Sequence, residues 1–244
     1  MNATYIDHSG TDLTVANAAR VSFSKESTWE IVGYEESADL DSRSLSYYPV
    51  ERLRDSDGRL IRYLASHNHW TPFAHPSVTL RERVPLFVAR QRFKHVVGFV
   101  YNEVSRRYVD DAPEFYTPEV WRARAENKKQ GSSDEPLSQT LRVKMGGEQT
   151  ITGAYERLME HATDLYEEMI EHGVAPEQAR MVLPQSMFTE FYVSGSLAAF
   201  ARAYNLRSAE DAQLEIQELS THWDRIIRPL FPVSWAALVD KDTN

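Results

Sequence analysis

Cysteine is absent from the 244-residue sequence, which excludes disulfide bonds, zinc–thiolate sites, iron–sulfur clusters and a cysteine nucleophile. The sequence also has neither G-x-G-x-x-G nor G-x-x-x-x-G-K-[ST], so a Rossmann dinucleotide fold and a P-loop are not expected. No apolar run approaches the ~20 residues of a membrane-spanning helix. Because the segment from Met1 to Gly10 also lacks the apolar core of a signal peptide, we expect a cytoplasmic protein with no membrane partner.

Positive charge is in short supply. The chain has 27 Lys and Arg residues against 36 Asp and Glu residues, which gives a formal net charge of −9. Proteins that bind nucleic-acid polymers are usually basic, so no such polymer is expected as a partner. Residues 90–108 depart from this balance, because they carry five Lys and Arg residues and a single acid, Glu103, among many apolar side chains. Cations beside buried surface need anionic partners, so this segment favours a small anionic ligand such as a nucleotide phosphate.

Apolar spacing and turn residues predict one α/β domain over residues 1–244. Alternating apolar residues predict strands over 78–84 and 187–193. Three–four spacing over 155–170, ended by Gly173, predicts a long amphipathic helix. Further helices are expected after it, which makes the second half of the chain helix-rich.

Other segments carry weaker signals. The polar residues 126–136 predict a flexible loop, and residues 24–48 are expected to be irregular. Pro85 is expected to begin a helix that carries Arg90, Gln91 and Lys94. Helix starts are also predicted at four capping residues: Asp12, Thr117, Ser196 and Ser208.

Some candidate site residues allow two interpretations. A helix would place Arg90 and Lys94 on one face, either as a ligand contact or as a solvated basic surface. Arg180 and Arg207 each border apolar residues, which suits a structural ion pair as well as an anion clamp. Three histidines could suggest a metal-dependent hydrolase, but their spacing fits no standard zinc pattern, and no metal is expected. They are His67, His69 and His75.

Six sequence blocks occur in a fixed order along nearly the whole chain. They are Ala18–Ser22, His69–His75, Phe87–Gln91, Asn102–Tyr108, Ala179–Pro184, and Leu206–Arg207 followed by Ala212–Ile216. In order and spacing they resemble the flavin-dependent thymidylate synthases, the ThyX family. The absence of cysteine agrees with this resemblance, because the other thymidylate synthase family attacks uracil with a cysteine thiolate.

The resemblance implies a ThyX-like fold with a central mixed sheet. It also implies a homotetramer whose active sites are shared between subunits. Such an enzyme would bind FAD and methylate deoxyuridine monophosphate (dUMP) to thymidylate (dTMP). Methylenetetrahydrofolate would supply the carbon, and NADPH would supply the reducing equivalents.

The family's residue roles carry over by position. Arg207 would be the catalytic residue, facing the uracil and favouring its deprotonated ring. Residues expected to hold dUMP are Gln91, Arg92, Lys94, Glu103, Val104, Ser105, Arg106, Arg107, Arg180 and Arg207. Residues expected to line FAD are Ser22, His69, Thr71, Lys94, His95, Glu103, Ser196 and Arg202.

The sequence departs from the family pattern on the flavin side. Lys94-His95-Val96 stands where the family has Arg-His-Arg, one extra residue precedes Asn102, and Ala74, Ser196 and Arg202 stand where Glu, Asn, and His or Asn are usual. Lysine is a point charge and cannot reproduce the arginine fork. Two alternatives to methylation are therefore hydroxymethylation of the same nucleotide and a non-catalytic nucleotide-binding homologue.

Overall fold

The computed structural model describes residues 1–38, 45–108, 111–125, 131–144 and 146–240. The chain separates into two compact units. The first unit comprises Met1–Tyr5, Leu80–Val193 and Leu206–His222, and the second comprises Ile6–Thr79, Ser194–Asn205 and Trp223–Asn244. Several strands and helices contribute residues to both units, and a single domain over 1–244 stays a prediction.

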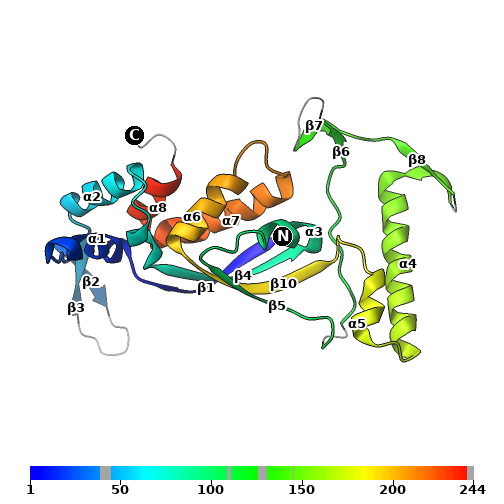
Figure 1. Ribbon diagram of the computed structural model, residues 1–244, viewed down its shortest axis with the longest axis horizontal. Coiled ribbons are helices and arrows are strands. Elements are labelled where there is room, and N and C mark those ends of the chain that lie inside the picture. The colour runs from blue at the N-terminus through cyan, green and yellow to red at the C-terminus, as the bar shows by residue number, and fades with distance from the viewer. Residues whose placement is uncertain (39–44, 109–110, 126–130, 145, 241–244) are drawn as a thin grey trace. The chain divides into compact units, whose positions relative to one another are not determined.

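A four-stranded sheet has the order β1–β4–β10–β5 (Figure 1). Its strands are β1 (Asn2–Ser9), β4 (Ser77–Pro85), β5 (Phe99–Glu103) and β10 (Phe188–Ser196). In β4, Val78, Leu80, Glu82 and Val84 are fully buried, while Thr79, Arg81 and Arg83 between them are less buried or exposed. This alternation places one strand face against the core. The strands predicted over 78–84 and 187–193 are confirmed.

Eight helices lie in the described residues. They are α1 (Asp12–Arg20), α2 (Asp55–Ser66), α3 (Leu86–Arg92), α4 (Ile151–Glu171), α5 (Pro176–Ala179), α6 (Leu197–Arg207), α7 (Leu214–Leu230) and α8 (Pro232–Val239). The α/β class and the helix-rich second half are therefore confirmed. Among the residues that the structure describes, no helix is long and apolar enough to cross a membrane.

The start of α1 was predicted in the wrong place by one residue, and the difference has a structural cause. Thr11 is the N-cap and forms a capping box with Thr14. The buried carboxylate of Asp12 instead accepts hydrogen bonds from the backbone N–H groups of Val233 and Ser234, at 2.9 and 2.8 Å. These groups belong to the first turn of α8, where backbone donors have no partner inside the helix. Asp12 therefore ties α1 to α8 within the second unit.

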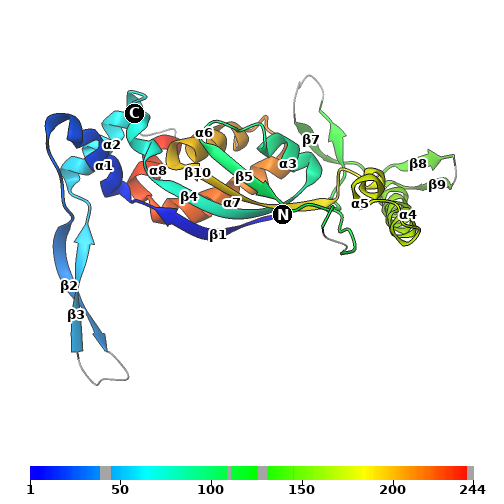
Figure 2. The same ribbon diagram turned by 60° about the horizontal axis from the view of Figure 1, so that its bottom comes forward.

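Residues 24–48 were predicted to be irregular, and this is wrong for 30–38 and 45–48. There β2 (Glu30–Ala38) pairs with β3 (Leu45–Arg52) in an antiparallel hairpin (Figure 2). Tyr47 and Tyr48 on β3 are both more than half exposed, although they are neighbours and point to opposite faces of the strand. On β2, Ile31 and Val32 are also about half exposed, beside an irregularity in the register. A strand exposed on both faces lacks the apolar–polar alternation on which the prediction depended.

Three further predictions are corrected. Thr117 opens no helix, because the preceding residues are held extended: Phe115 pairs with Met187, and the N–H of Tyr116 donates to Ser186. The loop predicted over 126–136 lies partly outside the described residues, and Ser132–Pro136 forms strand β7, which pairs with β6 (Arg122–Arg124). The helix expected from Ser208 begins only at Leu214. A second small hairpin joins β8 (Thr140–Val143) and β9 (Gly147–Thr150).

Candidate active site

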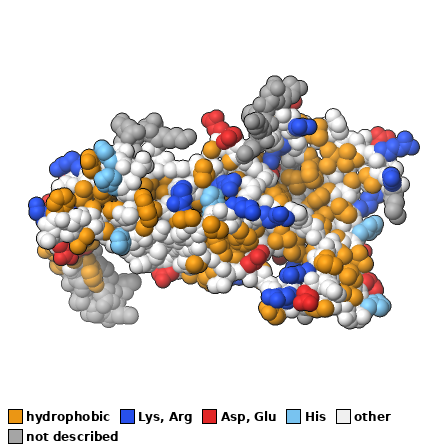
Figure 3. Space-filling model, viewed as in Figure 1, with side chains coloured by type: hydrophobic (Ala, Val, Ile, Leu, Met, Phe, Trp, Pro, Cys, Tyr) orange, Lys and Arg blue, Asp and Glu red, His pale blue; other side chains and the backbone are white. Residues whose placement is uncertain are grey.

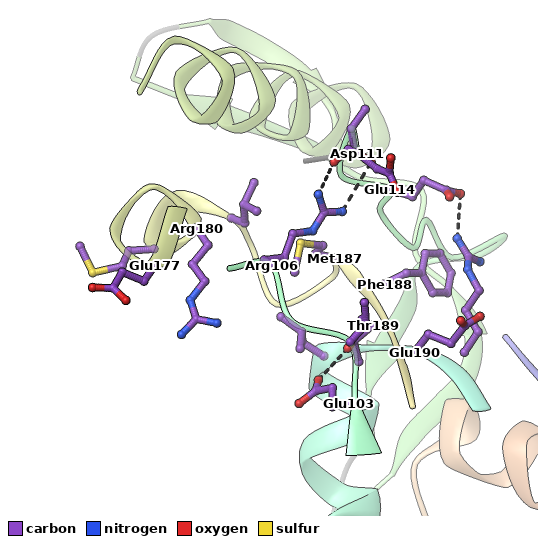
Figure 4. Close-up of a pocket in the computed structure, with 16 residues that line it drawn as sticks. Glu103, Arg106, Asp111, Glu114, Glu177, Arg180, Met187, Phe188, Thr189 and Glu190 are labelled. Carbon is purple, nitrogen blue, oxygen red and sulfur yellow. Dashed lines mark hydrogen bonds and ion pairs between the residues drawn. The ribbon is translucent and has the colours of Figure 1, made fainter. Parts of the chain in front are cut away.

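A cavity of about 660 Å³ lies in the first unit, beside β5, β10 and α5 (Figure 4). Its lining comprises Arg83, Leu86, Glu103, Val104, Arg106, Asp111, Ala112, Glu114, Glu177, Arg180, Met181, Leu183, Met187, Phe188, Thr189 and Glu190. Four of the predicted dUMP residues are among them: Glu103, Val104, Arg106 and Arg180. The structure therefore brings residues more than 70 positions apart into one cavity.

Hydrogen bonds to β10 hold the end of β5 and the segment that follows it. The backbone N–H of Val104 donates to the carbonyl of Glu190 at 2.9 Å, which keeps this segment beside β10. The hydroxyl of Thr189 donates to the Glu103 carboxylate at 2.6 Å. Glu103 is thus oriented by a buried threonine that was not among the predicted site residues.

The three arginines that line the cavity differ in their partners. Arg83 donates to Glu114 at 2.7 Å and stacks over Phe188 at 4.0 Å. Arg106 donates to the main-chain oxygen atoms of Asp111 and Ala112. The Arg180 side chain has no hydrogen bond or ion pair to the described residues, and Figure 4 draws it without one. Arg180 is therefore the cavity arginine whose guanidinium group is available to an anionic ligand.

Arg207 joins a second group of predicted residues in the same unit. Its Nε donates to Nε2 of His95 at 2.8 Å, and its Nη2 donates to the carbonyl of Gln91 at 3.3 Å. Burial and the positive charge of Arg92 lower the pKa of Arg207. Among the described residues no carboxylate pairs with Arg207, so its charge is held without an acidic partner.

Arg92, another predicted dUMP residue, has its side chain in the core. Arg92 and Glu82 are both fully buried, and their closest contact is 3.0 Å. The Arg92 guanidinium also donates to the Tyr101 hydroxyl at 2.7 Å and stacks over Phe99 at 4.4 Å. A cation satisfied in this way holds α3 on β4, and a contact of Arg92 with dUMP stays a prediction.

Lys94 also departs from the prediction. Helix α3 ends at Arg92, and Lys94 is an exposed residue beyond that end, so Arg90 and Lys94 do not share a helical face. Ser105 and Arg107 lie in the segment after β5 but outside the cavity lining. Arg107 Nε donates to Oγ of Ser105 at 3.3 Å. Their contact with dUMP stays a prediction.

The predicted flavin residues divide between the two units. Lys94, His95 and Glu103 belong to the first unit, and Ser22, His69, Thr71, Ser196 and Arg202 belong to the second. Ser22, His69 and Thr71 are exposed polar side chains. Ser196 accepts a hydrogen bond from the N–H of Ala199 at 3.2 Å, which confirms it as a helix cap and leaves its hydroxyl hydrogen to donate elsewhere. Hydroxyl, imidazole and ammonium donors suit the phosphates and ring edge of a flavin dinucleotide.

In the histidine segment, His67 packs against a neighbouring aromatic ring. His67 stacks on Tyr63 with ring centroids 4.1 Å apart, and its Nδ1 lies 2.9 Å from the Tyr63 carbonyl. Within the residues that the structure describes, no group of three or more His, Asp or Glu side chains could hold a metal ion.

The matching family model is described as thymidylate synthase complementing protein (Thy1), and it covers residues 4–233. A flavin-dependent thymidylate synthase of Thermosipho africanus is 34% identical over 205 residues, which span 83% of this chain and 85% of that protein. One of Thermus thermophilus is 34% identical over 233 residues, or 95% of this chain and 73% of that protein.

Solved structures agree with these relatives. The UMP/dUMP methylase PolB from Streptomyces cacaoi, bound with 5-Br dUMP, has a TM-score of 0.69 and 26% identity, with 97% of this chain and 93% of that chain covered. The same methylase bound with 5-Br UMP has a TM-score of 0.71. The chain described here therefore belongs to the flavin-dependent thymidylate synthase family and is a flavin-using thymidylate synthase.

Proposed function

We propose that this enzyme methylates dUMP to dTMP with FAD, taking the carbon from methylenetetrahydrofolate and the reducing equivalents from NADPH. The observation that carries the proposal is the Arg180 side chain, unpaired among the described residues, in a cavity that also contains Glu103, Val104 and Arg106. These residues come from two of the sequence blocks of the family. The cavity also holds several carboxylates, so a ligand phosphate would depend strongly on this free cation.

The phosphate is the part of dUMP that the cavity suits best. The Arg180 guanidinium can donate two parallel hydrogen bonds to a phosphate group. The neighbouring residues Ser105 and Arg107 supply a hydroxyl and a second guanidinium in the segment after β5. Because Arg106 is already bonded to main-chain oxygen atoms, we assign it the role of shaping that segment.

Arg207 is proposed to act on the pyrimidine ring. Its guanidinium is held by His95 and by the Gln91 carbonyl, so its orientation is set before substrate arrives. A fixed cation without an acidic partner stabilises negative charge that develops on the uracil during reaction.

The flavin, when bound, supplies the redox chemistry that the side chains lack. The residues proposed to hold it are those carried over from the family: Ser22, His69, Thr71, Lys94, His95, Glu103, Ser196 and Arg202. We also propose a homotetramer and a cytoplasmic location. The tetramer is supported by large exposed apolar side chains, including Leu158 and Leu165 on one helix.

A second candidate substrate is the ribonucleotide UMP. It is favoured by the likeness to PolB, which is described as a methylase of both UMP and dUMP. The chemistry at the base would be the same, and only the recognition of the sugar would differ.

The test is tritium release from C5-labelled dUMP with FAD, NADPH and methylenetetrahydrofolate. We expect a yellow protein, flavin-dependent release, and a product with the mass of dTMP. A hydroxymethylated product would replace the proposed reaction, and a colourless protein that binds dUMP without turnover would support the non-catalytic alternative. The same assay with labelled UMP decides between the two substrates.

A further inference from the structure

A chain of side-chain hydrogen bonds runs from Gln91 through the first unit. Gln91 Nε2 donates to Oε1 of Gln213, and Gln213 Nε2 donates to Oε2 of Glu215 at 2.8 Å. Arg122 Nη2 donates to the other carboxylate oxygen of Glu215 at 2.6 Å, and Arg122 Nε donates to Oγ of Ser132 at 2.7 Å. The chain therefore links α3, the start of α7, and the β6–β7 pair.

The Glu215 carboxylate fixes the direction of the hydrogen bonds that join it to Gln213 and Gln213 to Gln91. An ionised carboxylate can only accept hydrogen bonds, so the NH₂ group of Gln213 must face it. The oxygen of Gln213 then faces Gln91, and the NH₂ group of Gln91 must face Gln213. Reversing either amide would bring two acceptors or two donors together. The Oε1 atom of Gln91 is consequently the end directed away from Gln213.

The anchor of this chain is rigid. Glu215 is only 5% exposed, and both of its oxygen atoms are bonded. The main chain of Gln91 is held separately, because its carbonyl accepts a hydrogen bond from Arg207. Gln91 is thus restrained at its backbone and at its side chain before any ligand binds. A free glutamine side chain would lose rotamer freedom on binding, and this restraint reduces that loss.

We propose that Gln213, backed by Glu215, is a positioning residue of the nucleotide site. It holds the Gln91 carboxamide so that Oε1 accepts a hydrogen bond from the sugar or the pyrimidine of the substrate. This inference rests on the proposed function, because it takes Gln91 as a nucleotide contact. Phosphate oxygen atoms of the ionised substrate do not donate, so the Oε1 contact is assigned to the nucleoside part.

A double-mutant cycle on KM and kcat for dUMP tests the proposal. Gln213→Met keeps the side-chain length and removes the hydrogen bonds. We expect it to raise KM roughly three- to tenfold, the effect of one lost hydrogen bond. The value of kcat should change much less, because the contact is made in the ground state as well as in the transition state. In the Gln91→Met background, the same substitution should have no further effect on KM.

Gln217→Met is the matched control. Gln217 lies in the first turn of α7, which begins directly after Gln213, and donates to the Ala212 carbonyl at 2.8 Å. Its substitution therefore loosens the same turn without touching Gln91. Any effect of this control should be equal in the wild-type and Gln91→Met backgrounds.

Three results would overturn the proposal. Wild-type enzyme that fails to bind dUMP would remove the proposed function, and this inference with it. If wild type binds dUMP but Gln213→Met raises KM equally in both backgrounds, Gln213 has only a structural role and the proposed function stands. An unchanged KM for Gln91→Met would have the same consequence.

Discussion

At the scale of single residues, the partners of each arginine distinguish structural roles from binding roles. Arg92 is fully buried on Glu82, whereas Arg180 is exposed in a cavity and unpaired among the described residues. Both are arginines next to apolar residues in the sequence. The two roles are separated by the partner acid: Arg92 has Glu82, ten residues earlier in the sequence, and Arg180 has none among the described residues.

Arg180→Ala should raise KM for dUMP roughly ten- to hundredfold, because hydrogen bonds to a charged group are lost. The fold should not change, since the side chain is exposed. Arg180→Lys should be intermediate, because an ammonium group cannot make two parallel bonds. Steady-state kinetics measure this effect, with Arg157→Ala on the exposed side of α4 as the control. An unchanged KM in Arg180→Ala would remove this residue from the phosphate site.

Arg207→Ala should lower kcat about a hundredfold or more, the usual effect of removing a preorganised charge donor. Tritium release measures the loss, and circular dichroism checks that the fold is kept. Arg225→Ala, an exposed arginine on α7, is the control. Near-normal turnover in Arg207→Ala would refute the role on the pyrimidine.

Tyr101 predicts a loss of stability at high pH. Burial is the main reason that its pKa rises from 10.0 to about 12. A raised pKa means that the folded state holds this proton more tightly, so the stabilisation is complete below the unfolded value and is lost as pH rises from about 10 to about 12. Urea denaturation at pH 8, 9.5 and 11 measures the free energy of unfolding. This free energy should decline less with rising pH in Tyr101→Phe than in wild type. Tyr108→Phe, at an exposed tyrosine, should leave the slope unchanged, and equal slopes in all three proteins would contradict the argument.

At the scale of elements, the structure depends on polar groups that join one element to another. The Asp12 carboxylate supplies the missing acceptors of the first turn of α8, and Glu82 of β4 holds Arg92 of α3. Neither partner is a sequence neighbour. Buried donors such as these N–H groups and the Arg92 guanidinium would destabilise the fold if they had no acceptor. These pairs therefore specify how the elements pack together.

Glu82→Leu should destabilise the fold by about 3–5 kcal/mol, because it leaves a buried guanidinium without its carboxylate. The double variant Glu82→Leu/Arg92→Met should recover most of that loss, since no unpaired charge remains. Chemical denaturation at neutral pH measures both. If Glu82→Leu were tolerated, and Arg92→Met alone raised KM for dUMP, Arg92 would be a substrate contact after all.

Regular apolar patterns made some elements predictable. The buried face of β4, the cap at Ser196 and the helix ending before Gly173 follow local rules that need no knowledge of distant residues. The hairpin β2–β3 was missed because Ile31 and Tyr34 are exposed and no buried face repeats along it.

The candidate site was predictable only in part. Glu103, Val104, Arg106 and Arg180 were found through their sequence blocks, and the structure places them in one cavity. Thr189 and Gln213 were missed as site residues because each acts through a partner from a distant segment. The ion pair of Arg92 was missed, since an arginine fork looks the same in sequence whether a phosphate or Glu82 receives it.

At the scale of the whole molecule, the exposed apolar side chains of helix α4 bear on how the protein assembles. Helix α4 carries an apolar stripe, of which Met159, Ala162 and Tyr166 are buried. Leu158 and Leu165 are 58% and 51% exposed, and their spacing of seven places them on the same side. Figure 3 shows apolar atoms gathered where α4 lies. Surface of this kind commonly marks an interface with another protein.

The proposed tetramer should have a mass of about 112 kDa, four times the 28.0 kDa of the chain. Leu158→Glu with Leu165→Glu should reduce that mass, because two charges would be buried without partners. Light scattering after size exclusion measures it. Glu160→Lys changes charge on another side of α4 and should leave the mass unchanged. A wild-type monomer would refute the assembly.

The β2–β3 hairpin offers a position for site-specific labelling. Tyr47 is 62% exposed on that hairpin, and the chain contains no native thiol. Tyr47→Cys would therefore create the one site at which a maleimide dye or spin label can attach. Such a reporter follows how the hairpin is arranged in solution without first removing any competing sulfhydryl.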